Sequence, residues 1–233
     1  MKAEVKRLLS LLFMKDYNCI VCNRELPRPT PHLTCNSCYQ KMEIIEAGYC
    51  LKCGMKLFGE EEYCLDCQNH EKHFDRAFAP VVYAGAAANL VMNFKFQNKR
   101  YLAAPLAHYM TNKLLQEGIA ADVVIPVPLH ENRLKERGYN QSELLAEEIS
   151  RALGLPLDTS SVTRVKETLT SSLLTGGRTA REENVKDAFV IKDKKSLKGK
   201  IVLVVDDVLT TGATSSELSR VIKKAGAKKV YGV

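Results

Sequence analysis

Two acidic residues and a hydroxyl-rich turn follow an apolar run in the C-terminal part of the chain. Asp206 and Asp207 stand directly after Ile201–Val205, and Thr210–Thr214 then supplies three hydroxyls and one glycine. Carboxylates accept hydrogen bonds from sugar hydroxyls, and a turn that opens a helix can hold a phosphate with its backbone N–H groups. An Asp-Asp pair alone could simply cap a strand, but the complete string predicts a site for a sugar phosphate.

The eight cysteines form a second set of residues whose spacing suits chemistry. They all precede Gln68 and form four Cys-x-x-Cys pairs, which are Cys19/Cys22, Cys35/Cys38, Cys50/Cys53 and Cys64/Cys67. Each pair can place two thiolates on one ion from a tight turn, so the four pairs predict two structural Zn²⁺ sites. A disulfide scaffold and redox-active pairs are the alternatives, but no export signal is recognisable, and four successive redox pairs would be unusual.

The spacing leaves the grouping of the four cysteine pairs open. Sequential grouping gives the first two pairs to one ion and the last two pairs to the other. A cross-braced arrangement would exchange the inner pairs, and a third possibility is one occupied site with four thiols left over. Structural zinc of this kind contributes folding free energy outright, so a module built on these cysteines is expected to depend on its metal.

Length and charge divide the chain into two parts. The 233 residues suffice for a small module and one α/β domain, which we place at residues 1–75 and 76–233. The smaller part holds the cysteines and a predicted amphipathic helix over residues 4–14. It carries 10 Lys/Arg against 11 Asp/Glu, whereas the larger part carries 24 against 16. A polyanion should therefore be attracted first to the larger part.

The elements that must position the acidic pair alternate between strands and helices. Ile201–Val205 is typical of a strand buried on both faces of a parallel sheet, and Ala121–Val127 is typical of a second core strand. The other predicted elements are strands at Phe78–Tyr83, Ser161–Val165, Ala188–Ile191 and Lys229–Val233, helices at Asn89–Phe96, Ala103–Gln116, Ser142–Leu153 and Ser215–Ala225, and irregular loops over residues 129–141 and 166–183. This alternation predicts an α/β fold with a doubly wound parallel sheet. Ligands of such sheets bind beyond the carboxyl ends of the strands.

A run of alternating aromatic and cationic residues precedes the second predicted helix. Between Phe94 and Tyr101, the cationic residues are Lys95, Lys99 and Arg100. Single-stranded nucleic acids are bound by aromatic stacking platforms beside basic grooves, so these three cations are candidates for DNA binding. The alternative is that Phe94 and Phe96 pack in the core and that the cations are ordinary surface residues.

The string from Ile201 to Thr214 resembles the 5-phosphoribosyl 1-pyrophosphate (PRPP) motif of type I phosphoribosyltransferases. The resemblance implies that Asp206 and Asp207 hold the ribose hydroxyls and that the 5-phosphate is held by Thr210, Thr211, Gly212, Ala213 and Thr214. It also implies Mg²⁺ bound together with PRPP, because this ion uses substrate phosphates as ligands. Arg133 and Arg137 follow the first core strand and could hold the pyrophosphate, and a solvated helix face is the alternative.

A second string extends the resemblance to most of the chain. It consists of Pro126–Leu129, Arg133 and Arg137–Gln141, with Thr168 and Asn184-Val185 further on. With the cysteine pairs in front and the PRPP-type motif behind, this order is similar to the competence protein F family of bacteria. That family joins a zinc ribbon to a phosphoribosyltransferase-type domain and takes part in DNA uptake during natural transformation.

The resemblance implies a cytoplasmic protein that binds single-stranded DNA, PRPP and proteins of the uptake machinery. No apolar stretch is long enough to span a membrane. Three functions agree with the sequence at this point. They are a DNA-handling protein, an active phosphoribosyltransferase with an unidentified acceptor, and a PRPP-sensing module that has lost the chemistry.

Overall fold

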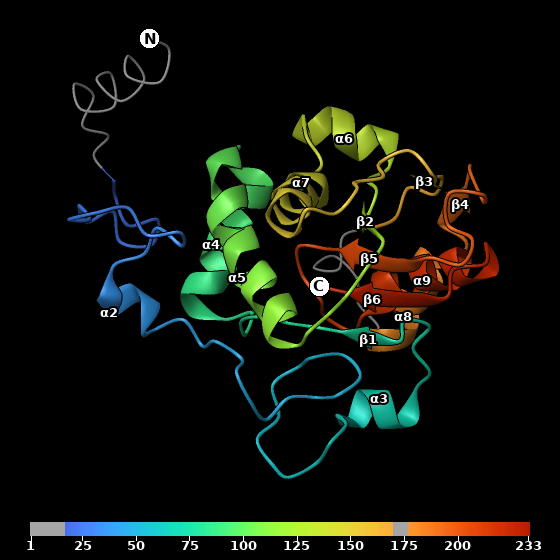
Figure 1. Ribbon diagram of the computed structural model, residues 1–233, viewed down its shortest axis with the longest axis horizontal. Coiled ribbons are helices and arrows are strands. Elements are labelled where there is room, and N and C mark those ends of the chain that lie inside the picture. Colours follow the sequence, from blue (N-terminus) through green and yellow to red (C-terminus); the bar gives the residue numbers. More distant parts are fainter. Residues whose placement is uncertain (1–16, 170–176) are drawn as a thin grey trace.

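A parallel sheet forms the centre of the molecule. The computed structural model describes residues 17–169 and 177–233, so the helix expected at residues 4–14 lies outside the described residues. Within them, the sheet has four strands in the order β1 (Arg76–Ala77), β6 (Lys229–Gly232), β5 (Ile201–Val205) and β2 (Val123–Pro126) (Figure 1). All neighbouring strands are parallel, as expected. The strand that carries the acidic pair is therefore an interior strand.

Helices cover both faces of this sheet. One face is covered by α5 (Ala103–Gln116) and α7 (Gln141–Leu153), and the other by α9 (Ala213–Lys224), with α8 (Gly177–Val185) packed against it (Figure 1). Side chains of β5 alternate between the two faces. Leu203 and Val205 belong to the apolar core beneath α5 and α7, and Val202 and Val204 belong to the core beneath α9. The predicted doubly wound arrangement is confirmed.

A second, antiparallel pair of strands stands apart from the main sheet. It consists of β3 (Val162–Arg164) and β4 (Phe189–Ile191). The remaining elements of this part of the chain are α4 (Gly85–Phe96), α6 (Glu131–Arg137) and a 3₁₀ turn at Arg100–Leu102. No helix among the described residues is long and apolar enough to cross a membrane.

Two stretches that were expected to be irregular contain helices. The first, α6, begins after His130, whose ring nitrogen accepts a hydrogen bond from the Asn132 N–H at 3.3 Å, and ends at Gly138 with a φ of 76°. The second, α8, occupies the end of the predicted loop at residues 166–183. Helix α6 has no buried residue, and α8 buries only Val185 among its described side chains. Because neither helix has an apolar stripe, periodicity could not reveal them.

The strand predicted at Phe78–Tyr83 is wrong. The structure has β1 at Arg76–Ala77, and the last sheet contact of this stretch is the Phe78 N–H donating to the Gly232 carbonyl at 2.9 Å. The chain then leaves the sheet, and Val81 forms an isolated bridge with Ile44 in the cysteine-rich part. The apolar residues that suggested a strand therefore serve contacts with the N-terminal module.

The cysteine-rich module packs along the edge of the sheet. Its described helices are the short α2 (Asn36–Tyr39) and α3 (Leu65–Asn69). The Ala77 N–H donates to the carbonyl of Lys52 at 2.8 Å, and the Ile45 N–H donates to the carbonyl of Pro80 at 2.9 Å. Contacts therefore cross the proposed boundary between residues 75 and 76.

Candidate functional site

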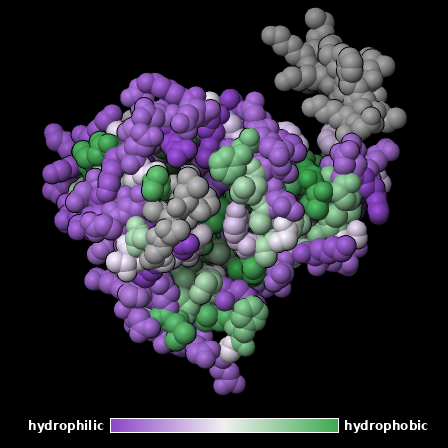
Figure 2. Space-filling model, turned by 180° about the vertical axis from the view of Figure 1, so that it is seen from behind, coloured by the Kyte–Doolittle hydropathy of each residue, from purple (hydrophilic) through white to green (hydrophobic). Residues whose placement is uncertain are grey.

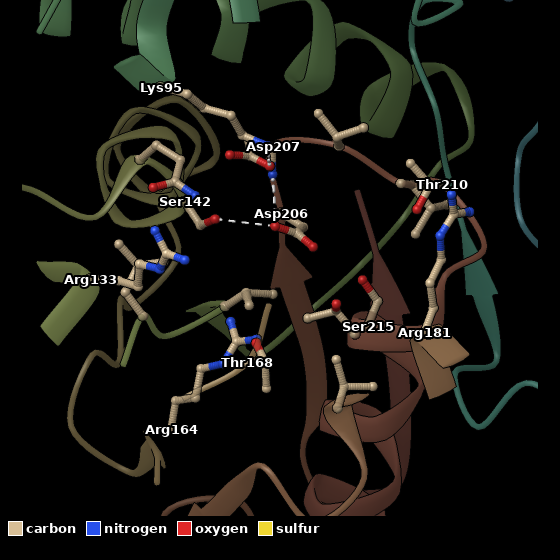
Figure 3. A pocket seen from close by; sticks show the side chains of 18 of the residues that line it. Lys95, Arg133, Ser142, Arg164, Thr168, Arg181, Asp206, Asp207, Thr210 and Ser215 are labelled. Carbon is tan, nitrogen blue, oxygen red and sulfur yellow. Dashed lines mark hydrogen bonds and ion pairs between the residues drawn. The ribbon is translucent and has the colours of Figure 1, made fainter. Parts of the chain in front are cut away.

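A cavity of about 440 Å³ opens beyond the carboxyl ends of β2 and β5 (Figure 3). Asp206 and Asp207 enter it from the end of β5, and Ser142 enters it from the first turn of α7. The face seen in Figure 2 is hollowed near its centre, and apolar as well as polar side chains border the hollow. The position is the one at which parallel α/β sheets bind their ligands.

The two carboxylates of the acidic pair have different surroundings. Asp206 accepts hydrogen bonds from the Ser142 hydroxyl at 3.3 Å and from the Asp207 N–H at 2.9 Å. Burial and the neighbouring charge of Asp207 raise the pKa of Asp206 to about 7, against the lowering effect of Lys95. Asp207 Oδ1 lies 2.8 Å from the Lys95 ammonium, whereas its Oδ2 is buried without a partner among the described residues. One carboxylate oxygen is thus left for a ligand.

The turn after the acidic pair closes the same cavity. Thr210–Thr214 line it together, and α9 begins at Ala213. Gly212 has a φ of 68°, a conformation that side chains disfavour, and a Cβ there would lie 3.3 Å from the Phe74 ring. The Thr211 hydroxyl oxygen is buried without a partner in the described part of the chain. A turn with an unused hydroxyl at a helix N-terminus is suited to an anion such as phosphate.

Five cationic residues of the described chain also line the cavity. They come from α4, α6, β3 and α8 and are Lys95, Arg133, Arg137, Arg164 and Arg181. The structure therefore brings both predicted arginines, Arg133 and Arg137, to the acidic pair and the turn. Arg133 pairs with Glu136 at 3.1 Å, and the guanidinium of Arg137 lies 5.1 Å from the centre of the Phe96 ring. A dense cationic lining of this kind attracts a multiply charged anion.

Arg164 is a partly buried member of this set. It projects from β3, donates a hydrogen bond to the Thr168 hydroxyl and lies 5.5 Å from the centre of the Phe189 ring. Burial lowers the pKa of Arg164, and the charge of Asp206 opposes this shift. Its Nε is buried without a partner among the described residues. Arg164 is therefore placed to add positive charge close to the acidic pair.

Sequence reasoning did not place Ser142 and Arg164 in this cavity, and it assigned Lys95 to DNA binding instead. Ser142 directly follows the string Arg137–Gln141, so its position in that motif was a usable signal. Arg164 carries no such signal, because the strand pair brings it to the cavity from a distant part of the sequence.

The three candidates for DNA binding make different contacts. Lys95 is engaged in the cavity with Asp207. Arg100 lies 4.6 Å from the centre of the Tyr139 ring and donates to the Gly138 carbonyl at 3.2 Å, which fixes the end of α6. Lys99 is partly buried in the turn before Arg100. Of the two neighbouring phenylalanines, Phe94 is fully buried, whereas Phe96 is 58% exposed and lines the cavity.

The eight cysteines gather in two groups of four. Cys19, Cys22, Cys35 and Cys38 form the first, and Cys50, Cys53, Cys64 and Cys67 form the second. Within each group the sulfur atoms all lie within 4.8 Å of one another. The Cys22 and Cys35 sulfurs are 3.8 Å apart, and those of Cys53 and Cys64 are 3.7 Å apart. A zinc tetrahedron with Zn–S bonds of ~2.3 Å has edges of about 3.8 Å, so both groups fit this ion. The grouping is the sequential one.

The surroundings lower the pKa of some cysteines and raise the pKa of others, such as Cys38, where burial has the largest effect. Hydrogen bonds from the Ser37 hydroxyl and the Cys38 backbone lower the pKa of Cys35 to about 6. Burial would raise the pKa of Cys50, but hydrogen bonds from the Cys64 and Cys53 backbone lower it to about 7. Each group therefore offers at least one thiolate near neutral pH to begin metal binding.

Comparison with known proteins matches both parts of the chain to families. Residues 8–68 match the double zinc ribbon domain, and residues 140–231 match the phosphoribosyl transferase domain. The first match covers the two cysteine groups, and the second covers α7, the antiparallel strand pair, the acidic pair and the phosphate-type turn.

Individual relatives align over most of the chain. Competence protein F of Haemophilus influenzae is 31% identical over 92% of this chain and 94% of its own length. The DNA utilization protein YhgH of Escherichia coli K12 is 30% identical over 78% of this chain and 80% of its own. Competence protein ComFC of Streptococcus pneumoniae is 29% identical, with 84% of each chain covered. With its double zinc ribbon and its phosphoribosyl transferase domain, this chain belongs to the competence protein F family.

Proposed function

We propose that this protein binds a phosphoribosyl ligand, PRPP with Mg²⁺, in the cavity at the end of β5 and acts in the handling of single-stranded DNA during uptake. The observation that carries the ligand is that two residues with a buried, unpartnered oxygen among the described residues, Asp207 and Thr211, both line this cavity. Buried polar atoms without partners are rare in proteins, and a ligand with hydroxyls and a phosphate would satisfy both.

The cavity provides a separate place for each part of this ligand. The carboxylates of Asp206 and Asp207 accept hydrogen bonds from the ribose hydroxyls. The turn Thr210–Thr214 surrounds the 5-phosphate with backbone N–H groups and hydroxyls. The arginines on the other side of the acidic pair, Arg133 and Arg164, lie on the side of the cavity left for the pyrophosphate (Figure 3). Mg²⁺ would be held by the pyrophosphate and would offset its charge.

Phosphoribosyl transfer is the second candidate activity, and the arginine-rich lining is the observation that favours it. Transfer breaks the bond between C1 of ribose and the pyrophosphate oxygen, and the departing pyrophosphate carries away the electron pair. Fixed cations around a departing anion stabilise the charge that develops on it. Arg133 and Arg164 are available for this in the cavity. A binding protein without turnover would use the same residues only to hold PRPP.

The names of the relatives and the charge distribution support the DNA part of the proposal. The relatives are named as competence or DNA utilization proteins. In this chain the surplus of cations lies in residues 76–233, where exposed Phe96 also offers a ring for base stacking. The proposed setting is the cytoplasm, where single-stranded DNA and PRPP would meet the protein together with proteins of the uptake machinery.

One experiment separates binding from transfer. The protein is mixed with PRPP, Mg²⁺ and a panel of nucleobases, and the release of pyrophosphate is followed. Separately, hydrogen exchange at the amides of residues 211–214 is measured with and without ribose 5-phosphate. Protection of these amides without pyrophosphate release identifies a PRPP-binding module, and base-dependent release identifies a transferase. Neither protection nor release would reject the phosphoribosyl ligand.

A further inference from the structure

A buried lysine connects the second cysteine group to the proposed phosphate turn. The side chain of Lys72 is 1% exposed and lies between α3 and the turn that precedes α9. Its ammonium is 2.7 Å from Asp66 Oδ2 and donates a hydrogen bond to the backbone carbonyl of Thr211. Lys72 is not among the described residues that line the cavity, so it approaches the turn from behind.

The bond to the Thr211 carbonyl fixes the orientation of one peptide plane. In a planar trans peptide, the carbonyl and the following N–H point in opposite directions. Because the Thr211 carbonyl is held toward Lys72, the N–H of Gly212 is turned to the opposite side. Gly212 lines the cavity with a φ of 68°, and because glycine is conformationally permissive, this peptide can reorient if the lysine bond is lost.

Asp66 ties this lysine to the metal-binding part of the chain. It lies on α3 between Cys64 and Cys67, two members of the second cysteine group. Asp66 also accepts a hydrogen bond from Arg178 at the start of α8. The ion pair with Lys72 and the hydrogen bond from Arg178 make Asp66 an anchor for the lysine.

Two neighbours of Lys72 secure the same turn. The ring of Phe74 packs with Cys50 and Cys53 in one apolar cluster and lies 3.3 Å from the position that a Cβ on Gly212 would take. The N–H of His73 donates to the Ser216 hydroxyl in the first turns of α9 at 3.0 Å. Three successive residues, 72–74, thus connect the second cysteine group to the turn.

We propose that Lys72 is a positioning residue that holds the Thr211–Gly212 peptide in the orientation required for phosphate. Because Asp66 anchors this lysine, the position of Lys72 depends on an intact second zinc site. The zinc ribbon is then part of the phosphoribosyl site, and loss of metal from the second cysteine group lowers the affinity for PRPP. This inference rests on the proposed function, because it assumes that the turn receives a phosphate.

The test compares full-length Lys72→Met with wild type and with Lys56→Met as a matched control. Lys56 also donates to a backbone carbonyl, that of Ala47 at 2.7 Å, and it belongs to the same module but does not contact the turn. We expect Lys72→Met to speed hydrogen exchange at Gly212 and to weaken PRPP binding, each by about tenfold, the factor that corresponds to one weak charged hydrogen bond. Zinc content and the behaviour of Lys56→Met should match wild type.

A second variant allows the test to be made even if Lys72→Met does not fold. Asp66→Asn retains the size of the side chain and leaves Lys72 in place, and it should raise exchange at Gly212 by a smaller factor. The double variant should be no worse than Lys72→Met, since both changes act on one connection. Wild-type exchange at Gly212 in Lys72→Met, or in Asp66→Asn if the lysine variant does not fold, would overturn the inference.

The two readouts separate this inference from the proposed function. Hydrogen exchange at the turn is measured without any ligand and reports on the connection alone. Faster exchange in Lys72→Met together with no PRPP binding by wild type would reject the proposed function and keep the structural connection. PRPP binding by wild type together with unchanged affinity and exchange in Lys72→Met would keep the proposed function and reject the role of Lys72.

Discussion

The ammonium of Lys95 lies 2.8 Å from Asp207 Oδ1, so the last turn of α4 neutralises a carboxylate that follows β5. The side chain of Asp207 is 5% exposed and that of Lys95 is 20% exposed. An ion pair this far from water is screened little by salt, and removing one partner leaves a buried charge. The pair therefore assigns Lys95 to the cavity, although the sequence suggested a surface that binds DNA.

The first prediction concerns this pair. Lys95→Met should lower the free energy of unfolding by about 1–3 kcal/mol, because the Asp207 carboxylate loses its charged hydrogen-bond partner. It should also raise the pKa of Asp206 further, since Lys95 now lowers it. Urea unfolding at pH 7 measures the first effect. Lys99→Met is the matched control and should stay within about 0.5 kcal/mol of wild type, as surface substitutions do. Equal free energies of unfolding for the two variants would show that this ion pair does not stabilise the fold.

The second prediction concerns pH. The pKa of Asp206 is raised in the fold to about 7 from an ordinary value of 3.8. The folded protein therefore holds this proton more tightly than the unfolded chain, and the resulting stability is complete below pH 4 and is lost as pH rises to about 7. Asp206→Asn cannot lose a proton, so its stability relative to wild type should increase between pH 4 and pH 7. A constant difference across this range would contradict the raised pKa.

The sequence predicted best where one continuous stretch carries the information. The string from Ile201 to Thr214 contains a buried strand, its acidic end and its turn, and each was located because strand, turn and helix signals follow one another. The local spacing of the cysteine pairs likewise predicted metal binding, and the structure shows that the pairs group sequentially.

The sequence could not predict features that depend on contacts between distant residues. Nothing near Lys72 indicates that it reaches the carbonyl of Thr211, and nothing near Arg164 indicates that β3 will pair with β4 and point this side chain into the cavity. The sequence did not predict helices α6 and α8 for another reason. Their stability comes from caps and ion pairs such as Lys135 with Glu131 at 2.8 Å, and these leave no apolar period.

The third prediction concerns single-stranded DNA and separates stacking from charge. Phe96→Ala should weaken binding by about 1–3 kcal/mol with little change in the salt dependence, because stacking releases no counterions. Lys99→Ala should lower the salt slope by about 0.7, which is the contribution of one phosphate contact with a single strand. Fluorescence anisotropy across a salt series with a labelled oligonucleotide measures both quantities.

Two residues of the cysteine-rich module provide matched controls for this prediction. Phe58 is 95% exposed and Lys41 is also exposed, so Phe58→Ala and Lys41→Ala make the same chemical changes on the other part of the chain. We expect both to bind DNA as wild type does. Loss of binding in the controls, with none in the variants of Phe96 and Lys99, would move the DNA site to the zinc ribbon.

The fourth prediction concerns metal. Elemental analysis should find two zinc ions per chain, because two groups of four thiolates are each grouped within 4.8 Å. The double variant Cys22→Ser/Cys35→Ser should retain one ion, since both residues belong to the first group and the second group stays intact. Each structural zinc contributes on the order of 10 kcal/mol to forming its part of the module, so partial occupancy of the second group is not expected. One ion or none in wild type would refute the assignment.

The central claim is that the acidic pair and the following turn bind a phosphoribosyl ligand, and calorimetric titration with PRPP and Mg²⁺ tests it most directly. Wild type should show one site per chain. Asp206→Asn/Asp207→Asn removes both charges and retains the side-chain sizes, so it should keep the zinc content and lose affinity by at least about tenfold, given about 1.5–3 kcal/mol for each charged hydrogen bond. Equal PRPP affinity for the two proteins, or no binding by wild type, would contradict the account.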